Sequence, residues 1–283
     1  MTSMPNAQLT PEVILAQIKR RYVTVPTARN MLTLETIASP TATWIKEDEL
    51  DGKVNFITGK GGFKKIYQNF SKKSISTVPY GVSFEVTRDE FNFQQYVTVN
   101  DKITSAINEF NSFENEYIWS SILENPEIPA VSAISAWTDT NTGKPMKDVQ
   151  NAKMAIKSAT KKRFSPTAII MSSACYGELL DYDFFKNGMY YNRDVIATGA
   201  IPTINGMTVI ENDDVDPDNV GQALVCVPGQ VGKLMETYPF TMVSSGWEST
   251  NNPMIHSTYY MFAQTAAAIT HPETAVLIEG LLG

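Results

Sequence analysis

Apolar residues recur at helical spacing in three segments of the chain. The first begins at Thr10-Pro11, a capping residue and a favoured first helical residue, and continues with Ile14 and Ile18 on one face. The second begins with Thr98-x-x-Asp101, which resembles a capping box, and stops at Asn125-Pro126. Its periodic apolar residues are Ile103, Ala106, Ile107, Phe110, Phe113, Tyr117, Ile118 and Ile122. This second segment predicts one long helix, suited to be the spine of an elongated molecule.

The third helical segment begins at Pro145 and has Val149, Ala152 and Ile156 on one face. It ends before Pro166, and the apolar run at 167–171 predicts a short buried strand. Two serines follow that strand and can cap another helix. These elements together predict a small α/β lobe.

Alternating apolar and polar residues predict strands in other parts of the chain. Val82, Phe84 and Val86 alternate with more polar neighbours, as in a half-buried strand. Asn205-Gly206 lies between two apolar runs and is the turn sequence of a tight hairpin, because both residues tolerate positive φ. Further strands are predicted at 237–243, 258–270 and 274–278. Residues 23–49 contain two prolines and predict an extended arm.

The composition is that of a globular protein, since 43% of the 283 residues are hydrophobic and 10% are aromatic. The formal net charge of −7 argues against a protein that mainly wraps duplex nucleic acid, because that affinity comes from lysine and arginine at phosphates. Cys175 and Cys226 lie in apolar stretches and predict two buried thiols. No secretory signal or membrane-spanning run is apparent, so we expect no membrane association.

Charge is distributed unevenly along the chain. Between Gly52 and Phe84 there are six lysines and no acidic residue. Gly59-Lys-Gly-Gly62 lies in the middle of this stretch and supplies a flexible turn. The lysines are Lys53, Lys60, Lys64, Lys65, Lys72 and Lys73. The stretch therefore predicts a projecting, cationic β-hairpin.

The motifs of common catalytic and ligand sites are absent or incomplete. Gly59-x-Gly61 lacks the third glycine of a dinucleotide fingerprint, and no P-loop occurs. Asp214-x-Asp216-x-Asp218 is rich in oxygen, but Asn219 and Val225 stand where a calcium loop needs glycine and a bidentate glutamate. The two histidines are isolated from each other and from any CxxC or HExxH motif. We therefore expect no enzymatic activity, no cofactor and no metal site.

The cationic stretch has two interpretations. Its lysines are interleaved with aromatic residues such as Phe63 and Tyr67, as in platforms for single-stranded nucleic acid. Alternatively, it contacts acidic residues of another copy of the chain, where charge complementarity would set register and on-rate. We favour self-assembly. The candidate contacts are Lys60, Gly61, Gly62, Lys64 and Lys65 on one surface and Asp213, Asp214 and Asp216 on the other.

The order of these elements resembles the major capsid proteins of tailed double-stranded DNA viruses with the Hong Kong 97-type fold. Three stretches carry the resemblance: Val78-Pro-Tyr-Gly-Val82 before the spine helix, 166–172 followed by 199–210, and 267–278. The resemblance implies an α+β fold with an N-terminal arm, an extended β-hairpin loop, a peripheral domain with the spine helix, and an axial α/β domain. The implied boundaries are 1–49 for the arm, 50–84 for the loop, 85–133 with 237–283 for the peripheral domain, and 134–236 for the axial domain.

The resemblance also implies a function. It implies a structural protein that self-assembles into pentamers and hexamers of an icosahedral shell, enclosing double-stranded DNA without reading its sequence. Other copies of the chain are the implied partners, with portal and decoration proteins as further candidates. Because the loop begins near residue 50, a separate scaffolding protein, or none, is implied. The expected location is the virion, with assembly in the host cytoplasm. The alternatives are an encapsulin-like shell around a cargo enzyme and a single-stranded nucleic-acid-binding protein.

Overall fold

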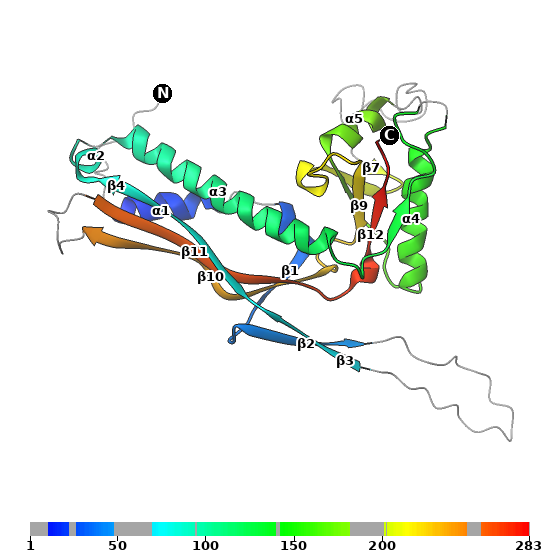
Figure 1. The fold of residues 1–283 in the computed structure, drawn as a ribbon, viewed down its shortest axis with the longest axis horizontal. Coiled ribbons are helices and arrows are strands. Elements are labelled where there is room, and N and C mark those ends of the chain that lie inside the picture. Colours follow the sequence, from blue (N-terminus) through cyan, green and yellow to red (C-terminus); the bar gives the residue numbers. More distant parts are fainter. Residues whose placement is uncertain are drawn as a thin grey trace, which may run out of the picture.

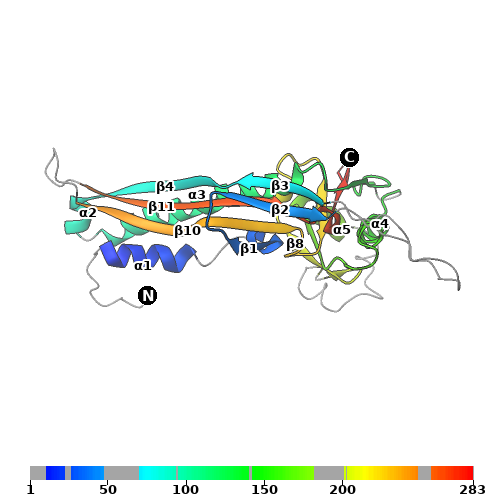
Figure 2. The same ribbon diagram turned by 90° about the horizontal axis from the view of Figure 1, so that it is seen from below.

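The structure is a computed structural model that describes residues 11–22, 27–47, 70–93, 95–139, 142–181, 201, 203–247 and 256–282. These residues form an elongated lobe and a compact lobe that meet at an angle (Figure 1). Seen from the side, both lobes lie in one thin layer (Figure 2). Among the described residues, no helix is long and apolar enough to cross a membrane.

A four-stranded sheet forms the elongated lobe, in the order β1-β10-β11-β4. Its strands are β1 (Leu32–Thr36), β10 (Gly232–Trp247), β11 (His256–Ile269) and β4 (Val78–Thr87). Strand β1 runs parallel to β10, and the other pairs are antiparallel. Helices α1 (Pro11–Tyr22) and α3 (Tyr96–Leu123) cover one face of this sheet. The short helices η1 (Thr27–Met31) and α2 (Arg88–Asn92) precede β1 and α3.

Helix α3 is the predicted spine helix, and its 28 residues confirm the prediction of one long element. Phe110 packs between Tyr80 of β4 and Phe240 of β10, with ring centroids 5.2 Å away in both cases. The predicted capping box is wrong, because Thr98 lies within the helix and Gln95 is the N-cap residue. Helix α2 lies just before α3 in the sequence, and the backbone N–H of Gln95 donates to the carbonyl oxygen of Glu90 in α2. Helix α3 therefore starts earlier than the local sequence indicates.

A six-stranded sheet forms the compact lobe, in the order β5-β12-β9-β6-β8-β7. Its strands are β5 (Ala130–Ser132), β12 (Ala275–Glu279), β9 (Gln222–Cys226), β6 (Ala168–Met171), β8 (Met207–Glu211) and β7 (Thr203–Ile204). Its helices are α4 (Pro145–Ala159), α5 (Ser173–Asp181), η2 (Asp213–Val215) and η3 (Pro272–Thr274). A separate ribbon of β2 (Thr41–Glu47) and β3 (Phe70–Ser76) extends from the body below both lobes in Figure 1.

Both faces of the six-stranded sheet are buried, and each is covered by different elements. Ile170 and Leu224 point to one face, where they pack with Val215 of η2 and the C-terminal end of α3. Ile169 and Val225 point to the opposite face, where they pack with α4 and α5. Because successive strand residues alternate between faces, a continuous apolar run such as 168–171 is what a strand covered on both sides requires.

Several local predictions for the compact lobe are confirmed. Asn205 (φ 50°) and Gly206 (φ 76°) form the turn between β7 and β8 with the positive φ values that a two-residue hairpin needs. The apolar face of α4 is buried as predicted. Cys175 and Cys226 are buried free thiols, and burial raises the pKa of Cys226 to about 12.

Strands β1, β2 and β12 pair outside the domains that the resemblance implies for them. Residues 32–36 and 41–47, implied to belong to the N-terminal arm, are strands β1 and β2 of two sheets. Strand β12, implied to belong to the peripheral domain, lies in the six-stranded sheet between β5 and β9. The pairings of β1 and β12 join segments far apart in sequence, which local patterns do not encode.

Candidate assembly surfaces

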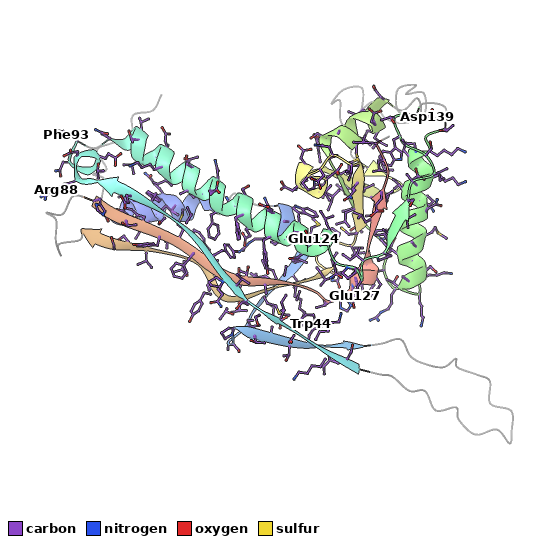
Figure 3. All side chains as sticks on the ribbon, in the orientation of Figure 1. Trp44, Arg88, Phe93, Glu124, Glu127 and Asp139 are labelled. Carbon is purple, nitrogen blue, oxygen red and sulfur yellow. The ribbon has the colours of Figure 1, made fainter. Side chains whose placement is uncertain are left out.

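The ribbon β2–β3 has one side on the body and one side exposed. Ala42 is buried against Met235 and Ala268, while Trp44 (labelled in Figure 3) is half-buried beside them. Ile45, on the other side of the ribbon, is 65% exposed. An apolar side chain this exposed on a projecting strand is available to another protein surface.

A buried threonine fixes the direction in which the ribbon leaves the sheet. Thr77 lies between β3 and β4, and its backbone N–H donates to the carbonyl of Pro40 at 2.8 Å. Its hydroxyl lies 2.9 Å from the hydroxyl of Thr237 and accepts from the Gln264 amide at 2.9 Å. These contacts join both ends of the ribbon base to β10 and β11, so the ribbon has a defined orientation.

The predicted cationic contacts fall between β2 and β3 in the sequence. Lys60, Gly61, Gly62, Lys64 and Lys65 fall outside the described residues and remain predictions. Of the six lysines in the cationic stretch, Lys72 and Lys73 are described. Lys73 pairs with Glu127, in the loop after α3, at 2.5 Å, so part of this positive charge is used within the chain.

The four-stranded sheet has an exposed apolar face opposite α3. Tyr259 and Met261 of β11 point toward α3, and the alternate residues Tyr260 and Phe262 point away from it and are 44% and 38% exposed. A shallow hollow of about 500 Å³ lies on this face. It is lined by Gly81, Val82, Ser83, Val243, Tyr260, Met261 and Phe262. The prediction for 258–270 identified the strand and missed this second apolar face, although aromatic residues at consecutive positions were a signal of it.

The acidic loop after β8 contains the other predicted contacts. Asp213 is exposed, and its carboxylate accepts the backbone N–H of Ser173 at 2.7 Å, which lowers its pKa. Asp214 is exposed, and its pKa is raised by partial burial and by the negative charges of Asp213 and Glu116. Both aspartates are therefore available at the surface, in a cluster of like charges.

Asp216, the third of the predicted acidic contacts, is buried and accepts hydrogen bonds within its own loop. Its side chain accepts the backbone N–H groups of Val220 and Gly221 at 3.0 Å and the hydroxyl of Ser172 at 3.4 Å. The residue is 1% exposed. The Asp216 carboxylate therefore holds the acidic loop in place from its buried side. The sequence does not distinguish this aspartate from its exposed neighbours.

The described residues contain no group of three His, Cys, Asp or Glu side chains placed to hold a metal ion.

Helix α4 has an exposed cationic surface. The segment 144–163 contains seven basic residues and one acidic residue, Asp148. Asp148 is buried and accepts from Trp137 Nε1 at 3.0 Å, so it does not offset the surface charge. The basic residues are Lys144, Lys147, Lys153, Lys157, Lys161, Lys162 and Arg163.

The described residues form a flat two-lobed body with a projecting ribbon and exposed apolar and charged surfaces. A model of the phage capsid protein family matches residues 71–276, and the chain therefore belongs to this family. No protein of curated function is matched in sequence.

Solved structures with the same fold include phage capsids and a virus-like particle. The capsid protein of cyanophage P-SCSP1u is 9% identical, with a TM-score of 0.69 over 100% of this chain and 93% of that one. The virus-like particle of Pyrococcus furiosus is 14% identical, with a TM-score of 0.67 over 95% and 99%. The capsid of Myoviridae phage XM1 is 10% identical, with a TM-score of 0.58 over 90% and 91%. The predicted α+β fold of the Hong Kong 97 type, and the identification as a tailed-phage major capsid protein, are confirmed.

Proposed function

We propose that this capsid protein assembles into pentamers and hexamers of an icosahedral shell that encloses double-stranded DNA. The observation that carries the proposal is the ribbon β2–β3, which leaves the body with Ile45 exposed. The exposed Ile45 on the ribbon and the exposed apolar sheet face of another copy can meet when copies lie side by side.

The proposal assigns a part to each region. The part of the implied loop at 50–84 that lies between β2 and β3 in the sequence reaches a neighbouring copy, whereas residues 78–84 belong to β4 of the chain's own sheet. The compact lobe lies around the five-fold and six-fold axes, and the elongated lobe forms the wall between them. The acidic body reduces adhesion of DNA to the shell, because like charge suppresses phosphate contacts. The shell would form in the host cytoplasm and remain in the virion.

Assembly of the purified protein tests the first part of this proposal. We expect fast-sedimenting particles that appear as polyhedra in negative-stain microscopy, and a protein that stays monomeric at all concentrations would overturn the proposal. Ile45→Asp should prevent particle formation while leaving the melting temperature of the subunit unchanged, because the side chain is exposed. Ile45→Val, which keeps the apolar surface, is the matched control and should assemble normally.

The contents of the natural particles test the second part. Particles from the native source, treated with nuclease before extraction, should contain protected double-stranded DNA. Particles that hold a cargo protein and no DNA would instead support the encapsulin-like alternative.

A further inference from the structure

The compact lobe carries charge of opposite sign on opposite faces of its sheet. Helix α4 packs on the face that contains Ile169 and Val225. The acidic loop packs through Val215 on the other face, with Ile170 and Leu224. Figure 1 shows the same arrangement, with α4 on one side of the strands and the η2 turn on the other.

The basic surface is a described and exposed part of the fold. Lys144, Lys147 and Lys162 are exposed, and Lys157 is half-exposed. Met154, which is 55% exposed, lies among them on the outward side of α4. A solvent-facing methionine with cations around it has the composition of a protein contact: an apolar centre and a charged rim.

The opposite surface has matching charge. Residues 211–218 contain five acidic residues and no basic residue, and four of the five are exposed. Glu116 of α3 adds a further exposed carboxylate close enough to raise the pKa of Asp214. Like charges held together at a surface are stabilised when an opposite charge from another molecule approaches.

We infer that α4 of one copy packs against the acidic loop and Glu116 of the next copy, in a repeated head-to-tail contact. Two different surfaces on opposite sides of one lobe form a heterologous interface, and such an interface closes into a ring when the rotation between copies allows it. Helix α4 lies at the outer edge of the compact lobe, and the η2 turn faces the angle between the two lobes (Figure 1). The inference rests on the proposed function and names the partner of the acidic loop as α4, in addition to the cationic hairpin.

Charge reversal of each surface tests the contact. Lys147→Glu with Lys157→Glu reverses the α4 surface, and Asp214→Lys with Asp218→Lys reverses the loop; Asp213 is kept because it holds the start of α5. Each reversed protein should assemble at least about tenfold more slowly than the wild type in light scattering, and the chain with both reversals should recover. High salt should reduce the difference between the wild type and the single-surface variants.

Mixing the two reversed proteins gives a sharper test. Each should assemble slowly alone, but equal amounts should form rings together, because each unlike pair restores opposite charges in both directions. Unlike copies can alternate only around a ring with an even number of members, so native mass spectrometry should find mixed even-membered rings and few odd-membered ones. Arg88→Glu, which reverses an exposed cation at the far end of the molecule (Figure 3), is the control. Any effect of this variant on assembly should not be reversed by the loop reversal.

The possible outcomes separate this inference from the proposed function. If the wild type forms no particles, the proposed function fails. If the wild type assembles, the melting temperatures are unchanged, and either reversed protein assembles at the wild-type rate, only the contact fails. Normal shells with reduced retention of DNA would show that α4 binds the polyanion, which also overturns the contact. The contact is also overturned if the chain with both reversals does not recover assembly and the mixture does not form even-membered rings.

Discussion

One arginine compensates two buried carboxylates where four elements of the elongated lobe meet. Arg29 Nη2 of η1 lies 2.7 Å from Glu114 Oε1 of α3 and 3.0 Å from Glu236 Oε1 of β10. The hydroxyl of Tyr80, from β4, donates to the same Glu114 oxygen at 2.8 Å. The side chain of Glu114 is fully buried. This network connects the N-terminal segment to the spine helix and the sheet.

Replacing Arg29 should therefore be costly. Arg29→Met leaves two carboxylates without their compensating charge, and we expect a loss of about 3 kcal/mol in the free energy of unfolding, measured with urea. Lys233→Met is the control, because Lys233 pairs with Glu35 at an exposed site and should lose less than about 1 kcal/mol. Equal losses in the two variants would contradict the structural role of Arg29.

The same network makes stability depend on pH. Burial raises the pKa of Glu236 above its ordinary value of 4.5, and the charge of Glu114 adds to this effect although Arg29 opposes it. A carboxyl whose pKa is higher in the folded state favours folding at low pH, and this contribution is lost as pH rises through the folded-state pKa.

Glu236→Gln removes that titration. Between about pH 4 and pH 7, the free energy of unfolding of the wild type minus that of Glu236→Gln should fall with rising pH, by at most ~1.4 kcal/mol per pH unit. Urea unfolding across this range measures the difference. A difference that stays constant or increases with pH would disprove the assignment.

At the scale of elements, β4 and β11 approach each other closely at Gly81. A Cβ atom on this residue would lie 2.5 Å from the carbonyl oxygen of Met261 and 3.0 Å from Cβ of Phe262. Gly81→Ala should cost about 1–3 kcal/mol, because the strands must separate to admit the methyl group. Gly177→Ala in α5 is the control, since no atom lies within 4 Å and alanine favours the helix. Thermal unfolding should show a lower melting temperature for the first variant and an unchanged or higher one for the second.

Element predictions succeeded where the signal is local. The spine helix, α4 and the Asn205-Gly206 hairpin follow from spacing and turn residues, which depend on neighbours in sequence. The start of α3 was placed too late because α2 lies immediately before it. Strand β1 was not predicted, since it pairs with β10, 200 residues away in sequence at Leu32 and Gly232.

At the scale of the whole molecule, the two lobes and the ribbon make a flat, angular subunit (Figure 1). A compact globular protein of this length would have a radius of gyration of roughly 19 Å. Small-angle X-ray scattering from unassembled subunits should give a clearly larger value. A value near that of a compact sphere would show that the lobes fold onto each other in solution.

For the candidate contacts, as for the fold, some features follow from the sequence and others only from the tertiary structure. The amino-acid sequence by itself determined the main helices, the hairpin at Asn205-Gly206 and the C-terminal strands, where charge of each sign is concentrated, and that the chain has the fold of a capsid protein. These properties reside in residue types and their spacing. Only the tertiary structure decided that Asp216 is buried while Asp213 and Asp214 are exposed, and that α4 and the acidic loop lie on opposite faces of one sheet. Burial and relative placement depend on contacts between residues distant in the chain, and no local pattern specifies those contacts.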